Sequence, residues 1–241
     1  MSIDLNGSSQ YLYRSAAIVG AYPFSWNIWF NADDAANPQT LIIIQDDSDA
    51  TRYWMLRLEG GGGVDPGRVL EWNGSTVRSA QTVNGINNDT TNWHNLIVVA
   101  ANSASRKVIL DGSLANLGES TANETPTGID ITVIGAANPN GTPVGYFNGE
   151  VAECGMWDAA LSDESVAALQ LYYPNEVQIN DLVAAWHFNT NADLNDLIGS
   201  NNLTAVGTPS TGASHPSLSS PAAGLSIPIV PRQRRNTLLR M

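Results

Sequence analysis

The stretch Arg68–Gln81, RVLEWNGSTVRSAQ, decides the class of fold. It contains two short runs that are rich in apolar and alternating residues, Arg68–Trp72 and Ser75–Gln81, and the pair Asn73-Gly74 separates them. Gly, and Asn at a lower cost than most residues, accept the positive φ angles that a tight hairpin turn requires. The stretch therefore predicts a β-hairpin.

The same pattern recurs along most of the chain. Short apolar or alternating runs lie between turn clusters such as Asp65-Pro66-Gly67, Asp111-Gly112 and Asn140-Gly141. Eleven short strands with turns about every 8–12 residues are typical of an all-β fold, a two-sheet antiparallel jelly-roll sandwich. The nine predicted strands outside the hairpin are Gln10–Arg14, Phe24–Phe30, Thr40–Gln45, Tyr53–Leu58, Asn95–Ala101, Lys107–Leu110, Ile129–Ile134, Tyr146–Trp157 and Leu182–Phe188.

Two regions depart from the strand pattern. Ser162 is followed by acids and then by apolar residues at helical spacing, until Pro174 ends the run. This predicts one short helix with Ser162 as its N-cap. After Gly207 the composition shifts to Ser, Pro, Gly, Thr and Ala, which is typical of an extended arm. We therefore expect a sandwich domain over residues 1–207 and an arm over residues 208–241.

Composition and charge exclude several classes of protein. The 241 residues are 43% hydrophobic, so the chain is not intrinsically disordered, and no apolar run approaches the ~20 residues that span a bilayer. The formal net charge is −12, and the sequence begins without the features of a signal peptide.

The last ten residues contain four arginines and no acid, which leaves seven bases against 23 acids in the body. Such a body repels nucleic acid. The basic residues of the tip are Arg232, Arg234, Arg235 and Arg240.

Four ordered motifs resemble the concanavalin A-like, laminin-G/pentraxin-type jelly-roll superfamily. They span roughly residues 1–170, and their order is more specific than any one of them. The motifs are Asp4–Tyr11 (DLNGSSQY), Pro23–Phe30 (PFSWNIWF), Trp93–Val98 with Arg106–Gly112 (WHNLIV and RKVILDG), and Tyr146–Glu153 (YFNGEVAE) followed by Trp157 and Ala160–Glu164. The run Leu182–Phe188 resembles a strand that opens the domain in many members, and its late position here suggests a circular permutation.

Aromatic residues are the candidates for sugar binding that the resemblance implies. Sandwiches that bind sugars place flat rings on the concave face or at loop tips, where they stack on pyranose C–H groups. We expect Trp72, Trp54 and Trp29 in this role, with Asn73 beside Trp72 at the tip of the hairpin. The alternative is that these tryptophans fill the core between the sheets.

Acidic residues offer two further candidate sites. The loop Asp46-Asp47-Ser48-Asp49 holds three carboxylates, Asp46, Asp47 and Asp49, and relatives of this kind often bind Ca²⁺ in edge loops. A solvated hairpin without a cofactor is the alternative, and it is favoured. Glu150 and Glu153 suggest a glycosidase pair, but a spacing of three places them on opposite faces of a regular strand unless a β-bulge intervenes. We therefore predict that the protein is not an enzyme.

Two functions remain, and neither is catalytic. A laminin-G-like sandwich without a signal peptide is similar to those of bacteriophage virions, where such domains serve in capsid decoration, tails and fibres. The resemblance implies a virion protein that is assembled in the host cytoplasm and docks through its arm, with other virion proteins or its own copies as partners. The alternative is an extracellular lectin-like domain that binds host-surface glycans, with or without Ca²⁺. A membrane partner is not expected.

Overall fold

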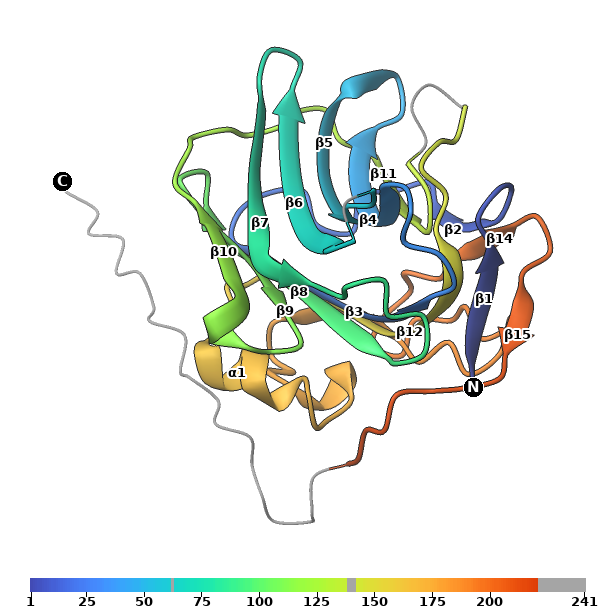
Figure 1. The fold of residues 1–241 in the computed structure, drawn as a ribbon. Helices are drawn as coiled ribbons and strands as arrows, with labels where there is room; N and C mark the ends of the chain where they lie inside the picture. The colour runs from blue at the N-terminus through green and yellow to red at the C-terminus, as the bar shows by residue number, and fades with distance from the viewer. Residues whose placement is uncertain (62, 138–141, 221–241) are drawn as a thin grey trace, which may run out of the picture.

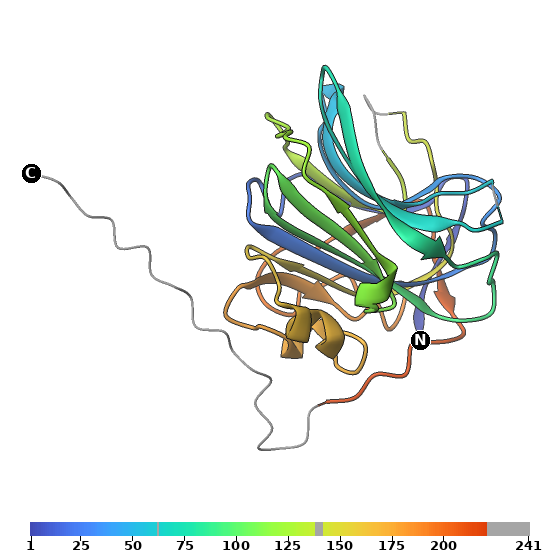
Figure 2. The ribbon, with the colours of Figure 1, turned by 60° about the vertical axis from the view of Figure 1, so that its left-hand side comes forward.

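The computed structural model describes residues 1–61, 63–137 and 142–220, which form two antiparallel sheets packed face to face (Figures 1 and 2). The eight-stranded sheet has the order β10-β9-β8-β3-β12-β1-β15, and β13 pairs with the second half of β12. Its strands are β10 Leu117–Ser120, β9 Ser105–Leu110, β8 His94–Asn102, β3 Phe24–Ala32, β12 Asn148–Trp157, β1 Ser2–Asn6, β15 Ser210–Gly212 and β13 Leu182–Trp186.

The seven-stranded sheet has the order β14-β2-β11-β4-β5-β6-β7. It contains the hairpin that the sequence predicts, because Trp72 pairs with Val77 across a turn in which Gly74 has a φ of 95°. The predicted all-β sandwich is confirmed. The strands of this sheet are β14 Thr204–Val206, β2 Tyr11–Arg14, β11 Ile131–Ile134, β4 Gln39–Asp46, β5 Asp49–Leu58, β6 Pro66–Asn73 and β7 Val77–Gly85.

The core lies between the two sheets because alternate residues of each strand point inward. In β3 the inward residues are Phe24, Trp26, Ile28 and Phe30, and all four are fully buried. Trp54 of β5 packs onto Phe24, with ring centroids 4.9 Å apart. Large aromatic side chains thus fill the gap between the sheets at the density that a stable interior requires.

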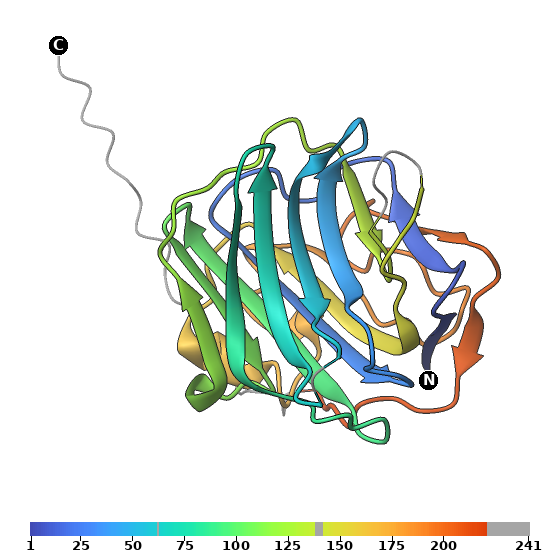
Figure 3. The same cartoon turned by 45° about the horizontal axis from the view of Figure 1, so that its top comes forward.

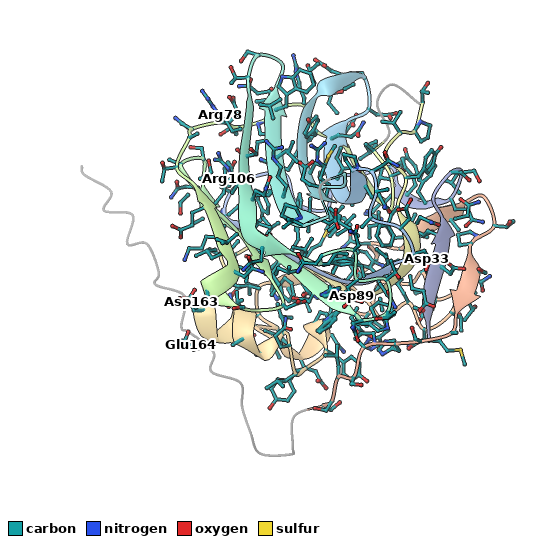
Figure 4. All side chains as sticks on the ribbon, in the orientation of Figure 1. Asp33, Arg78, Asp89, Arg106, Asp163 and Glu164 are labelled. Carbon is teal, nitrogen blue, oxygen red and sulfur yellow. The ribbon has the colours of Figure 1, made fainter. Side chains whose placement is uncertain are left out.

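One buried polar cluster links the sheets through the core. Arg106 of β9 lies 3.0 Å from the carboxylate of Glu71 of β6, and both side chains are almost fully buried. The hydroxyl of Tyr22 donates to the other oxygen of Glu71. Burial raises the pKa of Glu71 to about 7 although Tyr22 and Arg106 act in the opposite direction. Figure 4 labels Arg106, which lies on the side of the molecule where β9 and β10 meet β7.

The outer face of the eight-stranded sheet is covered by the chain that follows β12. Helix α1, Asp163–Ala168, begins where the sequence predicts, since the hydroxyl of Ser162 accepts a hydrogen bond from the amide of Ser165. Its length is six residues, so it is shorter than expected. The short 3-10 helix η3, Pro174–Glu176, follows. Together they bury Trp157, Val166, Leu169 and Val177 against the sheet.

The chain remains part of the sandwich beyond residue 207, where we expected the arm to begin. Strand β15 pairs with β1, and the amide of Ser219 donates to the carbonyl of Leu171. Residues 208–219 therefore belong to the folded body. Arg232, Arg234, Arg235 and Arg240 lie outside the described residues. In the part of the chain that the structure describes, no helix is long and apolar enough to cross a membrane.

Candidate functional site

The outer face of the seven-stranded sheet differs from that of its partner because no helix of the described chain lies over it (Figure 3). Tyr53 of β5 and Trp72 of β6 point outward from this face and are directly opposite each other across the two strands. Their rings meet edge to face, with centroids 5.9 Å apart and an interplanar angle of 86°. Both side chains are half-buried, which leaves aromatic surface open to solvent.

A groove of about 260 Å³ runs beside this aromatic pair. Ile43, Met55, Tyr53 and Trp72 line it, with Gln45 at one side. The groove follows the register of the sheet, because Gln45 pairs with Tyr53 and Ile43 pairs with Met55. Its floor is therefore apolar and is built on paired strands, which hold the ring positions more rigidly than a loop would.

A row of apolar side chains continues past the groove across five strands, and all of them except the half-buried Tyr13 are buried. Tyr13, Val133, Ile43, Met55 and Leu70 are successive partners in the register of the sheet. Tyr11 and Tyr146 pack beside this row. Of this cluster, the sequence predicts only Trp72. The tyrosines were missed, because alternation shows only that they face away from Leu12 and Trp54 and not which of the two faces is the outer one.

A charged group lies on the same face, next to Met55 and Leu70. Arg57 and Arg68 are cross-strand partners. Both guanidinium groups contact one carboxylate oxygen of Glu59, at distances of 2.6 Å and 2.9 Å. Two cations share one anion, so this end of the face carries a net positive charge in a protein whose overall charge is −12.

Two of the predicted sugar-binding tryptophans do not lie on this face. Trp54 points into the core, is fully buried, and donates its indole N–H to the hydroxyl of Tyr22 at 3.3 Å. Trp29 lies on the outer side of the eight-stranded sheet and is only 8% exposed. The alternative that a tryptophan fills the core is confirmed for Trp54, which strand parity turns inward, whereas Trp29 lies on an outer face and is buried there.

Asn73 lies beside Trp72, but its side chain takes part in the turn. Its side-chain oxygen accepts a hydrogen bond of 3.0 Å from the hydroxyl of Ser75. The residue is half-buried and follows the aromatic pair at the end of β6. Asn73 therefore holds the hairpin that presents Trp72.

The acidic loop satisfies its carboxylates with its own donors. Asp46 accepts from the amide and hydroxyl of Ser48, and Asp49 accepts from those of Thr51. Arg52 lies 3.1 Å from Asp49. The hydrogen bonds from Thr51 hold the pKa of Asp49 below its ordinary value. Asp47 is exposed at the tip. Among the described residues, no group of three or more His, Cys, Asp or Glu side chains is placed to hold a metal ion.

Glu150 and Glu153 lie on the same outer face of β12, in contrast to the regular spacing that the sequence suggested. The register of β12 against β3 shifts between Ala152 and Gly155, and Glu153 has a φ of 47°. This is the β-bulge that can bring the two acids together. Both carboxylates are occupied by the C-terminal chain: Ser214 donates to Glu150, and His215 contacts Glu153.

A second cavity, of about 390 Å³, lies at the end of the sandwich where β1, β4 and β12 meet. Its lining is polar and includes Asn6, Asp34, Asn37 and Gln39. The carboxamide of Gln39 is already engaged, because it donates to the carbonyl of Asp34 and accepts from the amide of Asn148. The groove beside Trp72 is therefore the stronger candidate site.

Comparisons with known proteins agree with this geometry. The sequence matches the family described as the concanavalin A-like lectin/glucanases superfamily over residues 6–167. A search of curated proteins finds no match.

Several solved structures share the fold. The sialidase module CBM40 of Ruminococcus gnavus, bound to α2,3-sialyllactose, is 15% identical with a TM-score of 0.52, over 62% of this chain and 83% of that chain. Domain 4 of the arabinanase AbnA from Geobacillus stearothermophilus, in complex with arabinotriose, is 18% identical with a TM-score of 0.54, over 69% and 74%. A heptameric pentraxin of Limulus polyphemus is 13% identical with a TM-score of 0.51, over 70% and 80%.

Proposed function

This chain belongs to the concanavalin A-like lectin/glucanases superfamily, and from that premise we propose that it is a carbohydrate-binding module. The binding surface is the outer face of the seven-stranded sheet, and the observation that carries the proposal is the exposed pair Tyr53 and Trp72 beside an apolar groove. A sugar ring has one face of C–H groups and a rim of hydroxyls. An aromatic platform next to polar side chains suits both parts of such a ligand.

The face offers a separate partner for each part of the ligand. The rings of Trp72 and Tyr53 receive the C–H face of a sugar in the groove. Arg57 lies four residues after Tyr53 on the same strand, about 13 Å away along the chain direction. This length accommodates an oligosaccharide of more than one ring, whose outer end meets the positive charge of Arg57 and Arg68.

Two structural neighbours support a glycan as the ligand. The CBM40 structure contains sialyllactose, and the arabinanase domain contains arabinotriose. These ligands are bound by those two proteins, and sequence identities of 15% and 18% show only that the fold is shared. They support the proposal because a sandwich of this kind is used there for oligosaccharide binding.

We propose binding without catalysis. The paired acids Glu150 and Glu153 lie on the other sheet, where the C-terminal chain occupies their carboxylates. Glycoside hydrolysis needs two carboxyl groups that flank an accessible substrate bond. The proposal also needs no calcium ion, since donors within the loop bond one oxygen of Asp46 and one of Asp49, and Arg52 lies near the other oxygen of each.

The decisive experiment is a glycan array followed by calorimetry with the best ligand. Trp72→Ala should weaken binding about 5- to 150-fold, because one aromatic stacking contact contributes roughly 1–3 kcal/mol. Trp72→Phe keeps an aromatic face and should retain most of the affinity. Circular dichroism confirms that each variant is folded. A folded Trp72→Ala variant that binds as tightly as the parent, or an array without any bound glycan, contradicts the proposal.

Attachment to a larger assembly is the second candidate function. Its support is the contrast between a body with seven bases and 23 acids and a terminal segment with four arginines and no acid. We propose a bacteriophage virion as the setting, assembled in the host cytoplasm, with the arginines directed at carboxylates of a partner protein. Deletion of residues 221–241 should abolish incorporation into particles and leave the sandwich folded. Unchanged incorporation excludes this role.

A further inference from the structure

A short segment near the C-terminus crosses the outer face of the eight-stranded sheet. We call residues 213–219 the strap. It leaves β15 beside β1 and reaches the end of α1, where Ser219 forms a bridge with Tyr172 (Figure 1). The strap contains no strand or helix within its own length. Its position therefore depends on side-chain and isolated backbone contacts.

Glu150 provides the first anchor of the strap. Its carboxylate accepts hydrogen bonds from the hydroxyl and the amide of Ser214, at 2.8 Å and 3.3 Å, and from the amide of Ala213 at 3.2 Å. Ser2 donates to the same carboxylate at 2.6 Å. Burial raises the pKa of Glu150, but these hydrogen bonds outweigh it and hold the pKa below its ordinary value. This anchor is therefore present at neutral pH and is lost only in acid.

Glu153 provides the second anchor and differs in kind. Its side chain is fully buried, and two imidazole rings contact its two oxygens. His187, just after β13, places Nδ1 2.8 Å from Oε2, and His215 of the strap places Nε2 2.8 Å from Oε1. The other ring nitrogen of His215, Nδ1, lies 2.8 Å from the carbonyl oxygen of Pro216.

The hydrogen bonds around His215 fix a proton count. A carbonyl oxygen only accepts, so Nδ1 of His215 carries a hydrogen. Between Nε2 and Glu153 there must also be a hydrogen, because a bare nitrogen lone pair facing a carboxylate forms no hydrogen bond. That hydrogen belongs either to an imidazolium or to a protonated carboxyl group. In both cases the cluster of Glu153, His187 and His215 holds at least one proton more than a carboxylate with two neutral imidazoles.

We propose that the cluster is a proton-dependent clasp, in which the extra proton shared by His215 and Glu153 fixes the strap to β12. When that proton leaves, either the contact with Pro216 or the contact with Glu153 breaks. The buried carboxylate then faces a lone pair, and the strap loses this anchor and is held by the contacts of Glu150 and Leu171 alone. Residues 221–241 follow the strap in the sequence. The clasp therefore determines whether the residues just before that segment are held on the sandwich.

The charges that face the clasp favour the protonated state. Asp193, Glu176 and the carboxylate of Glu153 act on His187, and the hydrogen bond to Glu153 is the largest cause of its raised pKa. Tyr173 packs against both imidazoles, with its ring centroid 5.1 Å from that of His187 and 6.5 Å from that of His215. Cys154, on the other side of β12, is buried, and its burial raises the pKa of the thiol, so it adds no charge at neutral pH.

The sign of the pH dependence follows from this arrangement. A histidine whose pKa is raised in the folded protein stabilises the fold below its unfolded pKa, and this contribution is lost as the pH rises through the folded value. The raised pKa of His187 gives the cluster this sign, and the two hydrogen bonds of His215 require the extra proton, so the strap should loosen as the pH rises. The contacts of Glu150 show the opposite pH dependence: they are lost as the pH falls, because the pKa of Glu150 is below its ordinary value.

Amide hydrogen exchange of the full chain tests the proposal. Protection factors, which are corrected for the intrinsic pH dependence of exchange, should fall about tenfold in the strap between about pH 6 and about pH 9. Amides of β3 and β8 should keep their protection over the same range. His215→Gln should remove this pH dependence, because glutamine gains and loses no proton there.

Two matched variants complete the test. Glu150→Gln should lower strap protection at every pH and preserve the fall toward alkaline pH, since hydroxyls and amides hold that anchor. His94→Gln removes a histidine that pairs with Asp111 away from the strap, and should leave the strap unchanged. Strap protection that is constant from about pH 6 to about pH 9 would overturn the clasp. The same holds for a His215→Gln variant that keeps the parent's pH dependence.

Discussion

Two tryptophans point outward from opposite sheets of the sandwich, and their surroundings differ. Trp157 extends from the eight-stranded sheet and is fully buried beneath the chain that follows it, and its indole N–H donates to the carbonyl of Val177 at 3.0 Å. Trp72 extends from the seven-stranded sheet and stays half-exposed beside Tyr53. Strand alternation alone places both rings on outer faces. What separates them is whether later chain packs over the face.

The difference shows how the chain divides stability and binding. Much of the chain between β12 and residue 220 covers the eight-stranded sheet, through α1, η3 and the strap. Among the described residues no helix lies over the seven-stranded sheet, and Tyr53 and Trp72 on its outer face stay half-buried. An exposed apolar surface is unfavourable in water unless a partner uses it. The open face is therefore where a ligand is expected, and the covered face is where stability is expected.

The substitution with the largest expected effect on stability is Trp157→Ala, and it tests this comparison. The change removes a fully buried ring and its hydrogen bond to Val177, and leaves a cavity between the sheet and its cover. We expect a loss of about 3–5 kcal/mol in the free energy of unfolding. Urea denaturation measures it directly. A loss below about 1 kcal/mol would mean that the covering chain contributes little, and the contrast between the faces would fail.

Glu71 lies in the interior between the two sheets, so a change in its protonation should alter the stability of the whole sandwich. This effect on stability depends on pH. The pKa of Glu71 is raised from 4.5 to about 7, mainly by burial, so the folded protein holds this proton more tightly than the unfolded chain does. Stability is therefore lost as the pH rises from about 4.5 through about 7. The loss is on the order of 3 kcal/mol relative to a variant without this group.

Glu71→Gln provides that reference. The variant keeps a neutral carboxamide beside Arg106 at every pH, so this position no longer gains or loses a proton. The difference in unfolding free energy between the parent and the variant should thus shrink from pH ~4.5 to pH ~7. A difference that grows with pH would show that the pair with Arg106 outweighs burial.

The sequence predicts which residues form strands more reliably than which way they point. All eleven predicted strands exist, because turn residues and alternation are local signals. The orientation of Trp54 is not local. Tyr53 and Trp54 are adjacent aromatic residues, and only pairing with β4 and β6 decides which of them enters the core. Trp72 therefore lies half-buried on an outer face, where its role in sugar binding stays a prediction, and Trp54 enters the core.

Two further features depend on contacts between distant parts of the chain. Trp29 lies on an outer face, as alternation predicts, but it is buried there, with only 8% of its surface exposed. The bulge at Glu153 places a non-glycine residue at a φ of 47°, a conformation without a sequence signature here. His187 and His215 meet at this carboxylate although they are 28 positions apart in sequence, so the spacing of histidines along the chain gave no sign of the cluster.

The smallest expected effect on stability is that of Trp72→Ala. The ring is half-buried and contacts Tyr53 on a face without a cover, so its removal opens no enclosed cavity. We expect a loss of about 1 kcal/mol or less in the free energy of unfolding, against the several kcal/mol of Trp157→Ala. The comparison of the two substitutions in the same urea titration cancels the intrinsic effect of replacing Trp by Ala. If Trp72→Ala proves as destabilising as Trp157→Ala, the outer face of the seven-stranded sheet is structural, and a loss of glycan binding in that variant would reflect unfolding rather than a missing contact.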